Sequence, residues 1–354
     1  MKQGSALAAA LALLLGTVGL LSVTKAALSP ARGQTVSQWL ARTQLGDMAK
    51  APAETTLVRL NPADAQETSE QAESLGSEPQ PVPVTEVQEA WDEEARKTEA
   101  IPPAPSPVTV DGDLSLEIRN ETDYPVVFSE LPALPEGMKF DTTEPVILLM
   151  HTHGSESYED PDNPGVYRTS DPSKSVLAVA EAMKTVLEQR GYGTIHDDTI
   201  CDEPEFTGAY NRSRQVIQEN LAAYPSLQLV LDVHRDAVED ENGDQIRMVC
   251  QLEGDTAAQL MLVVGSDAGG LEHPDWRENL SLAAVLQARL AGSYPGLMRP
   301  VNLRTERFNQ DLAPMDLLVE VGSSGDTLEE AIRTARVFAE ALADVLDQYS
   351  GKSS

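Results

Sequence analysis

Hydrophobic and polar positions from about residue 114 onward follow two alternating patterns. Short apolar runs predict strands, and the most apolar of them are typical of strands buried on both faces. The predicted strands are Leu114–Ile118, Pro145–His151, Gly193–His196, Leu227–Val233, Ile246–Leu252, Gln259–Gly265 and Leu317–Val321. Longer segments with helical spacing of apolar residues predict helices over Ser173–Arg190, Ala209–Ala223, Trp276–Ala291 and Thr327–Leu346. Because strands and helices alternate, we expect an α/β domain whose mixed, mostly parallel sheet carries helices on both faces.

The N-terminal segment from Ser5 to Val23 is uncharged and apolar. It has about the 20 residues that a helix needs to cross a bilayer. Lys2 precedes it, which predicts that the N-terminus stays inside and the rest of the chain is exported. A cleaved signal peptide is the alternative, because Thr24 and Ala26 form a small-residue cleavage site. We therefore expect residues 1–26 to be a single-pass anchor in the cell membrane or a signal segment, with the folded part extracytoplasmic.

Residues 27–108 show little apolar periodicity and are rich in proline, alanine, serine and acidic residues. A segment of low hydrophobicity and one charge sign buries too little apolar surface to offset the entropy cost of ordering its backbone. We predict a mostly disordered linker over this range. The folded domain is then expected over residues 109–354.

The charge balance and the cysteine count narrow the range of functions. Among 354 residues, 26 are basic and 57 are acidic, which gives a formal net charge of −31. Nucleic acid is therefore excluded as the main partner, because its phosphates are bound mainly by lysine and arginine. The only cysteines are Cys201 and Cys250, which excludes both a disulfide-dense scaffold and a four-cysteine zinc site.

Three of the predicted strands end beside residues that can bind a metal or transfer a proton. His153 and Glu156 follow one strand, His234 follows a second, and Glu320 lies in the last. Ligands of open α/β sheets bind beyond the carboxyl ends of the strands. Two histidines, one glutamate and a water make a catalytic zinc site, and a further carboxylate can take the proton of that water. We predict that His153, Glu156 and His234 bind Zn²⁺ and that Glu320 is the general base.

Two of these assignments have alternatives. His151 shares a face with His153 on an extended strand. It can therefore replace His153 as a metal ligand, or it can contact a ligand without binding the metal itself. Glu320 can instead form a structural ion pair with Arg235 or Arg307.

Six segments, in order, resemble the stage II sporulation protein P family. They are ILLMHTHGSESY, GYGTIHDDT, AYNRSRQVIQ, LVLDVHRDA, HPDWRENLSLA and RFNQDLAPMDLLVEVGSSGDTLEEA, and they cover nearly all of the predicted folded part. The resemblance implies a membrane-anchored, zinc-dependent N-acetylmuramoyl-L-alanine amidase that faces the cell wall and acts in engulfment during sporulation. Its substrates would be the stem peptides of peptidoglycan, and cleavage of peptide cross-links is also implied. The implied partners are a lytic transglycosylase (stage II sporulation protein D) and a membrane scaffold (stage II sporulation protein M).

The wider amidase superfamily implies the same site residues. Its first histidine ligand lies in a motif like DPGHGG, which matches ILLMHTHG at His153. Its later histidine ligand lies in a motif like SIHAN, which matches His234, and its catalytic glutamate precedes a glycine as Glu320 does in LLVEVG. Glu156 is the closest motif carboxylate for the remaining ligand, while Glu181 lies inside a predicted helix and matches no family position.

Other motif residues are suited to support the metal or to hold substrate. Guanidinium groups bind carboxylates of a stem peptide, and side-chain amides bind its peptide groups. These candidates, each with a structural role as the alternative, are His151, Arg212, Arg235, Asn309 and Gln310. Two positions depart from the family pattern, because Gly154 stands where serine is common and Asp326 stands where asparagine is usual.

A non-catalytic member of the same fold, which binds or scaffolds the cell wall, is the alternative function. The four residues His153, Glu156, His234 and Glu320 favour the enzyme, because a pure binding protein has no need of all of them.

Overall fold

The computed structural model describes residues 56–59, 106–110, 114–134, 140 and 144–350. The predicted membrane segment Ser5–Val23 and most of the predicted linker lie outside the described residues. Within the described ranges, no helix is both long enough and apolar enough to span a bilayer.

The fold is built on an eight-stranded mixed sheet. Five of its seven neighbouring pairs are parallel, and the β2–β3 and β9–β11 pairs are antiparallel. In spatial order the strands are β2 (Ser106–Val110), β3 (Leu114–Asn120), β10 (Val301–Leu303), β9 (Leu260–Val264), β11 (Met315–Ser323), β6 (Leu229–Asp236), β4 (Ile147–Met150) and β5 (Thr194–His196). The prediction of a mixed, mostly parallel α/β sheet is confirmed.

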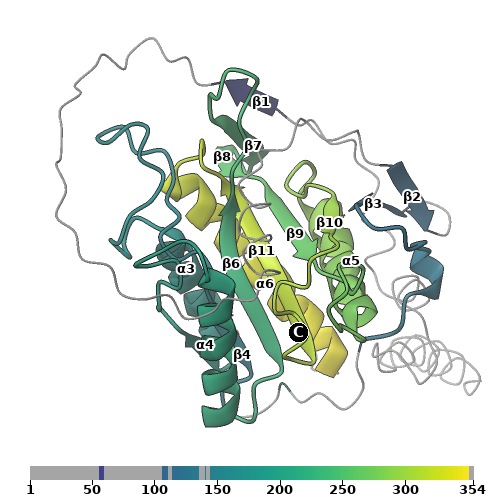
Figure 1. Ribbon diagram of the computed structural model, residues 1–354. Helices are drawn as coiled ribbons and strands as arrows, with labels where there is room; N and C mark the ends of the chain where they lie inside the picture. The colour runs from purple at the N-terminus through teal and green to yellow at the C-terminus, as the bar shows by residue number, and fades with distance from the viewer. Residues whose placement is uncertain (1–55, 60–105, 111–113, 135–139, 141–143, 351–354) are drawn as a thin grey trace, which may run out of the picture.

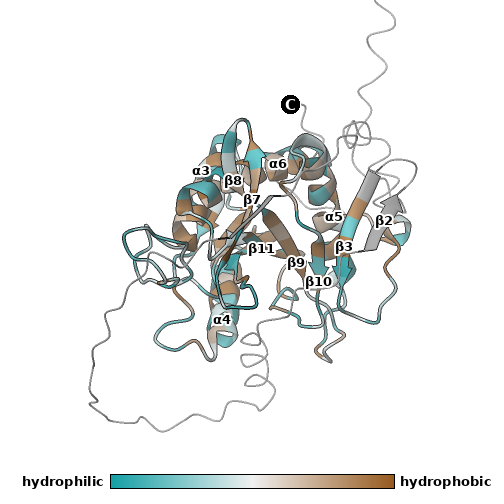
Figure 2. Cartoon of the chain, turned by 90° about the horizontal axis from the view of Figure 1, so that it is seen from above, coloured by the Kyte–Doolittle hydropathy of each residue, from teal (hydrophilic) through white to brown (hydrophobic). Residues whose placement is uncertain are grey.

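Helices cover both faces of this sheet, as predicted. Three of them pack on one face and one packs on the other, with the sheet between them (Figure 1, Figure 2). The first group is α3 (Val176–Gln189), α5 (Trp276–Ser293) and α6 (Leu328–Ser350), and the fourth helix is α4 (Ala209–Ala223). A short 3-10 helix, η3 (Phe128–Glu130), follows β3.

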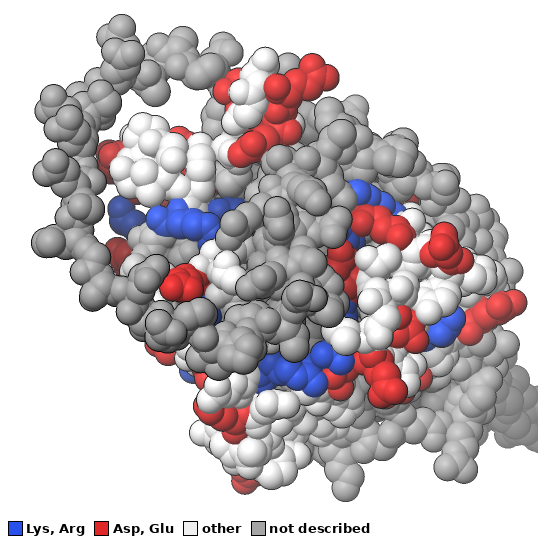
Figure 3. Space-filling model, viewed as in Figure 1, with Lys and Arg blue, Asp and Glu red and all other residues white. Residues whose placement is uncertain are grey.

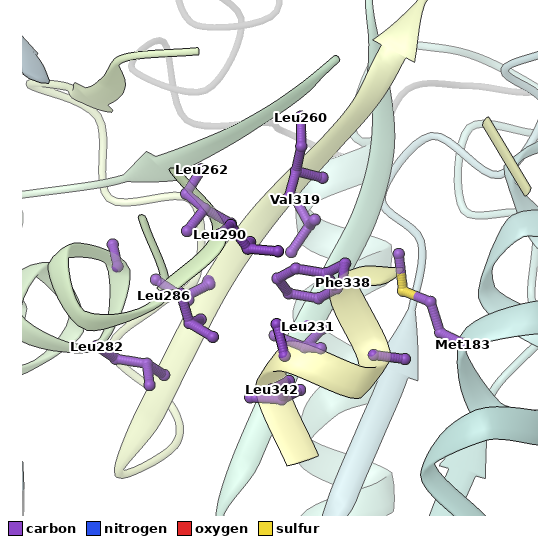
Figure 4. Packing of buried hydrophobic residues seen from close by; sticks show 14 of the residues in the cluster. Met183, Leu231, Leu260, Leu262, Leu282, Leu286, Leu290, Val319, Phe338 and Leu342 are labelled. Atoms are coloured by element: carbon purple, nitrogen blue, oxygen red, sulfur yellow. The ribbon is translucent and has the colours of Figure 1, made fainter. Parts of the chain in front are cut away.

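The face covered by three helices holds the main hydrophobic core. Leu231 of β6 and Val319 of β11 point toward Phe338 of α6 (Figure 4). Leu286 of α5 lies in the same core. Every second residue of a strand faces the same side, so Leu229, Leu231 and Val233 all enter this core. Burial of these side chains stabilises the fold by roughly 1.5–3 kcal/mol for each large aliphatic residue.

The opposite face of the same strands changes from apolar to polar along their length. Val230 of β6 packs with Met150 of β4 and Ile217 of α4 in a smaller cluster. The next residues of β6 on this face are Asp232 and His234, both buried. On this face, β4 and β6 therefore pack against α4 through apolar side chains, and polar side chains lie at the carboxyl end of β6.

A second, antiparallel sheet lies beside the main one. Its order is β1 (Thr56–Arg59), β7 (Ile246–Leu252) and β8 (Asp255–Ala258). The β7–β8 turn is made by Glu253 and Gly254, with φ angles of 53° and 96°, as a two-residue hairpin turn requires. Strand β1 lies inside the segment predicted to be a linker, and β2 crosses its boundary, so this segment contributes paired strands to the fold.

Candidate metal centre

The ends of two neighbouring parallel strands bring His153, Glu156 and His234 together. His153 and Glu156 lie in the loop that follows β4, and His234 lies in β6, which pairs with β4. One potential ligand atom from each residue lies within 4.8 Å of the other two, and all three residues are buried. The Glu156 carboxylate is central, since Oε1 is 3.7 Å from His153 Nδ1 and Oε2 is 3.5 Å from His234 Nδ1.

This cluster fits a zinc ion in both chemistry and spacing. Two imidazoles and one carboxylate are common zinc donors, and ligands at about 2.0–2.2 Å from a tetrahedral ion lie roughly 3.4 Å apart. The observed separations of 3.5 and 3.7 Å are close to that value. In the described part of the chain, the buried Nε2 of His153 has no hydrogen-bond partner, which leaves this imidazole incompletely satisfied.

Burial and charge set the protonation of His153 and Glu156. Burial lowers the pKa of His153 to about 4, so its imidazole is neutral near pH 7 and keeps a free electron pair. Burial alone would raise the pKa of Glu156, but the charges of Arg235 and His234 outweigh it and hold that pKa below its usual range. The pair therefore offers a neutral imidazole and a charged carboxylate, which are the forms that bind metal.

Asp232 orients His234, a role that the sequence reasoning missed. His234 Nε2 donates a hydrogen bond of 2.7 Å to Asp232 Oδ1, which leaves Nδ1 toward Glu156. The backbone N–H and the hydroxyl of Thr152 donate to the same carboxylate at 2.8 and 2.6 Å. Burial lowers the pKa of His234, but the Asp232 carboxylate raises it more, so that it lies well above the usual range. The signal was available in the sequence, because residues two apart on a strand share a face.

Glu320 faces the cluster from the adjacent strand. It lies directly opposite His234 in the parallel β11–β6 ladder, so both side chains leave the same face of the sheet. Its Oε2 is buried and accepts no hydrogen bond from the described residues. Burial raises the pKa of Glu320 to about 8, and the nearby Asp236 carboxylate acts in the same direction.

The ion pairs considered for Glu320 do not form. Arg235 instead lies 3.9 Å from Glu156, and Arg307 instead pairs with Asp311 at 3.0 Å.

His151 lies outside the cluster. Its Nδ1 donates to the carbonyl oxygen of Val233 at 2.9 Å, and its Nε2 lies 3.0 Å from His196 Nε2. Burial lowers the pKa of His151 to about 3, so it is neutral. Since both ring nitrogens are engaged away from Glu156, the structure brings His153 rather than His151 to the potential metal ligands. A supporting role for His151 stays a prediction.

The two arginines proposed as substrate contacts hold loops of the protein. Arg235 is buried and donates to the carbonyl oxygens of Ser157 and Tyr167 at 2.9 and 2.8 Å. Its backbone N–H also donates to Glu156 Oε2 at 3.2 Å. Arg212 donates to three carbonyl oxygens of the loop before α4, those of Cys201, Glu205 and Thr207.

The two amides proposed as substrate contacts are also engaged within the protein. Asn309 donates to the carbonyl oxygen of Tyr210 at 2.8 Å. Gln310 donates to the carbonyl oxygen of Val263 at 3.0 Å and accepts from the N–H of Gly265 at 2.7 Å. Substrate contacts by Asn309, Gln310 and the two arginines stay predictions.

Two aromatic residues that sequence reasoning did not select surround His153. Phe206 stacks on its ring, with centroids 4.5 Å apart and 23° between the planes. Tyr210 approaches the same ring edge-on at 5.7 Å. Tyr210 lies in the segment AYNRSRQVIQ that carries the family resemblance, whereas Phe206 lies in the loop before it and gave no signal.

A family model described as stage II sporulation protein P matches residues 37–343. The chain belongs to this family. Stage II sporulation protein P of Bacillus subtilis (strain 168) is 27% identical over 215 residues, a match that covers 56% of this chain and 51% of that protein. The match thus spans about half the length of this curated relative.

Solved structures with some likeness to the fold include several amidases. The catalytic domain of CwlV, an N-acetylmuramoyl-L-alanine amidase from Bacillus (Paenibacillus) polymyxa var. colistinus, is 16% identical with a TM-score of 0.36, over 58% of this chain and 97% of that one. Ami1 of Mycobacterium abscessus is 15% identical with a TM-score of 0.34, over 58% and 98%. The CwlD amidase of Clostridioides difficile, solved with the GerS lipoprotein, is 15% identical with a TM-score of 0.33, over 58% and 95%. At these values the likeness says nothing about the activity of this chain.

Proposed function

We propose that this chain is a zinc-dependent peptidoglycan hydrolase, an N-acetylmuramoyl-L-alanine amidase that also cuts peptide cross-links. One observation carries the proposal, namely the buried His153–Glu156–His234 cluster with Glu320 opposite His234, where the buried Oε2 of Glu320 has no hydrogen-bond partner among the described residues. Membership of the stage II sporulation protein P family supports a role in septal wall remodelling and engulfment during sporulation.

The residues divide the chemistry of amide hydrolysis between them. His153, Glu156 and His234 would hold the zinc ion, and Asp232 keeps His234 oriented for it. When bound, zinc supplies Lewis-acid activation of the attacking water and of the substrate carbonyl. Glu320 accepts a proton at its carboxylate and returns it to the leaving nitrogen. A carboxylate in this position can act first as general base and then as general acid.

The cellular setting is part of the same proposal. A membrane segment at residues 5–23 would hold the catalytic domain outside the cytoplasm, beside the cell wall. The proposed partners are the peptidoglycan stem peptides, the membrane, and the lytic transglycosylase and membrane scaffold of engulfment.

Product analysis tests this proposal. The full-length chain, loaded with zinc in detergent, is incubated with purified peptidoglycan, with and without a zinc chelator, and the products are identified by mass spectrometry. Chelator-sensitive release of free stem peptides is the expected result, and separated cross-links would add the endopeptidase activity. Intact peptidoglycan in the presence of folded, zinc-loaded protein would favour the non-catalytic, wall-binding alternative.

The matched control is Glu320→Gln, which keeps the size of the side chain but removes the base. This variant should bind zinc in the same ratio as the wild type and release no stem peptide. Wild-type rates from it would remove Glu320 from the role of base.

A further inference from the structure

Arg168 stands at the edge of the metal centre, in a position fixed by the backbone. Glu156 and Arg168 are partners in an isolated antiparallel bridge. Hydrogen bonds from Ser157 N to Tyr167 O and from Thr169 N to Ser155 O, at 3.0 and 2.7 Å, flank this pair. Cross-strand partners project to the same side of the two segments. The guanidinium Nη2 accordingly lies 3.9 Å from Glu156 Oε1.

Arg168 differs from the buried Arg235 in having donors left for a ligand. Its side chain is 44% exposed, whereas that of Arg235 is 4% exposed. Its Nη1 donates to Asp202 Oδ2 at 2.6 Å and to Ser155 Oγ at 3.0 Å. Its Nη2 donates no hydrogen bond within the described part of the chain, since the 3.9 Å separation from Glu156 is too long. This edge of the guanidinium is therefore available to a ligand.

The guanidinium is also held in place before any ligand arrives. The Asp202 side chain that binds it is 1% exposed and also accepts hydrogen bonds from the backbone N–H of Ser155, at 3.0 Å, and from its hydroxyl. The Cζ atom lies 4.8 Å above the ring of Phe206, which itself stacks on His153. A guanidinium fixed by a buried carboxylate and an aromatic face loses little freedom when it binds a carboxylate with two parallel hydrogen bonds.

We propose that Arg168 binds a free carboxylate on the peptide part of the substrate, one residue beyond the amide that is cut, with Phe206 packed against the guanidinium. The inference rests on the proposed function and names the substrate form that the site prefers. The reacting carbonyl would lie at the His153–Glu156–His234 cluster, and one peptide residue spans about 3.5 Å, so the next residue reaches Arg168. Arg168 is thus a specificity-determining residue that favours a carboxylate over the corresponding carboxamide.

Two matched muramoyl peptides test this role. They differ only in a free carboxylate or a carboxamide on the second peptide residue, one residue beyond the scissile bond. With the full-length, zinc-loaded chain, we expect kcat/KM to be about tenfold or more higher for the acid, as a charge-assisted hydrogen bond provides. In Arg168→Gln, KM for the acid should rise until the preference is within about twofold, while KM for the carboxamide changes much less. A wild type without preference, or an Arg168→Gln variant that retains it, would overturn the inference.

Asp202→Asn separates a specific role from a structural one. This variant removes the charge that holds Nη1 but keeps the guanidinium, so it should weaken the preference for the acid and leave some of it. A purely structural role of Arg168 predicts equal losses with both peptides in both variants, together with a lower zinc content, and that result would also reject the inference.

Binding of the two peptides to the zinc-loaded Glu320→Gln variant by calorimetry tests the same preference without turnover. Failure of the wild type to cut either peptide would count against the proposed function. Equal binding of the two peptides would count against the role of Arg168 alone.

Discussion

Asp232 connects the metal centre to the strand beneath it. Its carboxylate accepts the Nε2–H of His234 and two hydrogen bonds from Thr152 in the loop that carries His153. One buried side chain therefore orients one predicted ligand and anchors the loop of two others. Partners of this kind raise the basicity of a ligating imidazole and fix its ring.

We predict that Asp232→Asn lowers zinc affinity by about 10- to 100-fold, because the neutral amide orients His234 less strongly. Competition against a chromophoric chelator measures this affinity. Asp316→Asn is the matched control, since Asp316 is also buried but forms no hydrogen bond or ion pair with the three predicted ligands in the described part of the chain. It should bind zinc within about twofold of the wild type. Equal zinc affinity in Asp232→Asn and the wild type would show that Asp232 does not support the ligand.

Asp326 predicts a dependence of stability on pH. It is buried, and its carboxylate accepts from Met248 N at 2.9 Å and from Ser323 N at 2.7 Å. Burial raises the pKa of Asp326 to about 7, and the Glu330 carboxylate adds to the increase. Because this pKa is raised above its unfolded value, the native state binds the proton more tightly. The stabilisation is complete below about pH 4 and is lost as pH rises through about 7.

We therefore expect Asp326→Asn, which cannot titrate, to flatten the pH profile. The fall in unfolding free energy from pH 5 to pH 8 should be smaller than in the wild type by about 2–3 kcal/mol. Urea unfolding of both proteins at several pH values measures these free energies. A chelator is present throughout, so that metal binding does not contribute to them. Parallel profiles of the two proteins would mean that Asp326 does not titrate in this range. The loss of an acceptor in the variant lowers its stability at every pH and leaves this comparison intact.

At the scale of elements, β11 bends directly after Glu320. The register against β6 shifts between Glu320 and Ser323, and Gly322 adopts a φ of 75° within this irregularity. A Cβ on Gly322 would lie 2.7 Å from Asp326 Oδ2 and 2.8 Å from Ala258 Cβ. Glycine is required here by both the backbone conformation and the space.

We predict that Gly322→Ala destabilises the protein more than Gly191→Ala does. Gly191, at the end of α3, has a φ of 84°, but a Cβ there would meet nothing within 4 Å. Both variants carry the cost of a left-handed alanine, about 1–2 kcal/mol, and Gly322→Ala adds about 1–3 kcal/mol of overpacking. Urea unfolding at one pH measures both losses. Equal losses would show that the neighbours of Gly322 move aside freely.

The elements with strong apolar patterns were predictable, and the short ones were not. The predicted bounds of α4 and β7 agree with the structure. Strand β6 begins two residues later and ends three residues later than predicted, and β11 extends two residues beyond each predicted end. Strands β8 and β10 were missed because they have only four and three residues. Strand β8 forms a hairpin with β7, whereas β10 is also stabilised by pairing with the distant β3. The insertion of β11 between β6 and β9 could not be predicted either, since packing between remote segments decides strand order.

Some residues of the candidate site could likewise be predicted from the sequence, and others could not. His153, Glu156, His234 and Glu320 could be selected because each lies at or near the end of an apolar strand, and the structure brings the first three together. Arg168 and Phe206 could not be selected, because they lie in loops whose paths depend on the rest of the fold.

The whole molecule is strongly acidic, with a formal net charge of −31. On the face shown in Figure 3, short groups of basic side chains lie among the acidic ones. Such a charge balance opposes the approach of an anionic substrate over long distances. Attraction for a peptide carboxylate therefore has to be local, which is the role that we infer for Arg168 beside the metal centre.

Zinc should couple the metal centre to the stability of the whole fold. The predicted ligands come from the loop after β4 and from β6, both anchored in the sheet. An ion that binds only the native state adds about 2.7 kcal/mol at 100 times its dissociation constant. For a domain of this size that raises the melting temperature by roughly 5–10 °C, as measured by calorimetry of the chelator-treated and zinc-loaded chain.

The same titration on His234→Ala separates this site from unspecific binding. Zinc should leave the melting temperature of this variant unchanged, because only two of the three predicted ligands remain. Magnesium is the second control, since it prefers oxygen ligands and should not stabilise the wild type at the same concentration. If zinc stabilises His234→Ala as much as the wild type, the ion binds elsewhere, for example to the many surface carboxylates, and the assignment of His234 is wrong. A shift confined to the wild type would tie the stability of the central sheet to the residues from which the catalytic proposal is built.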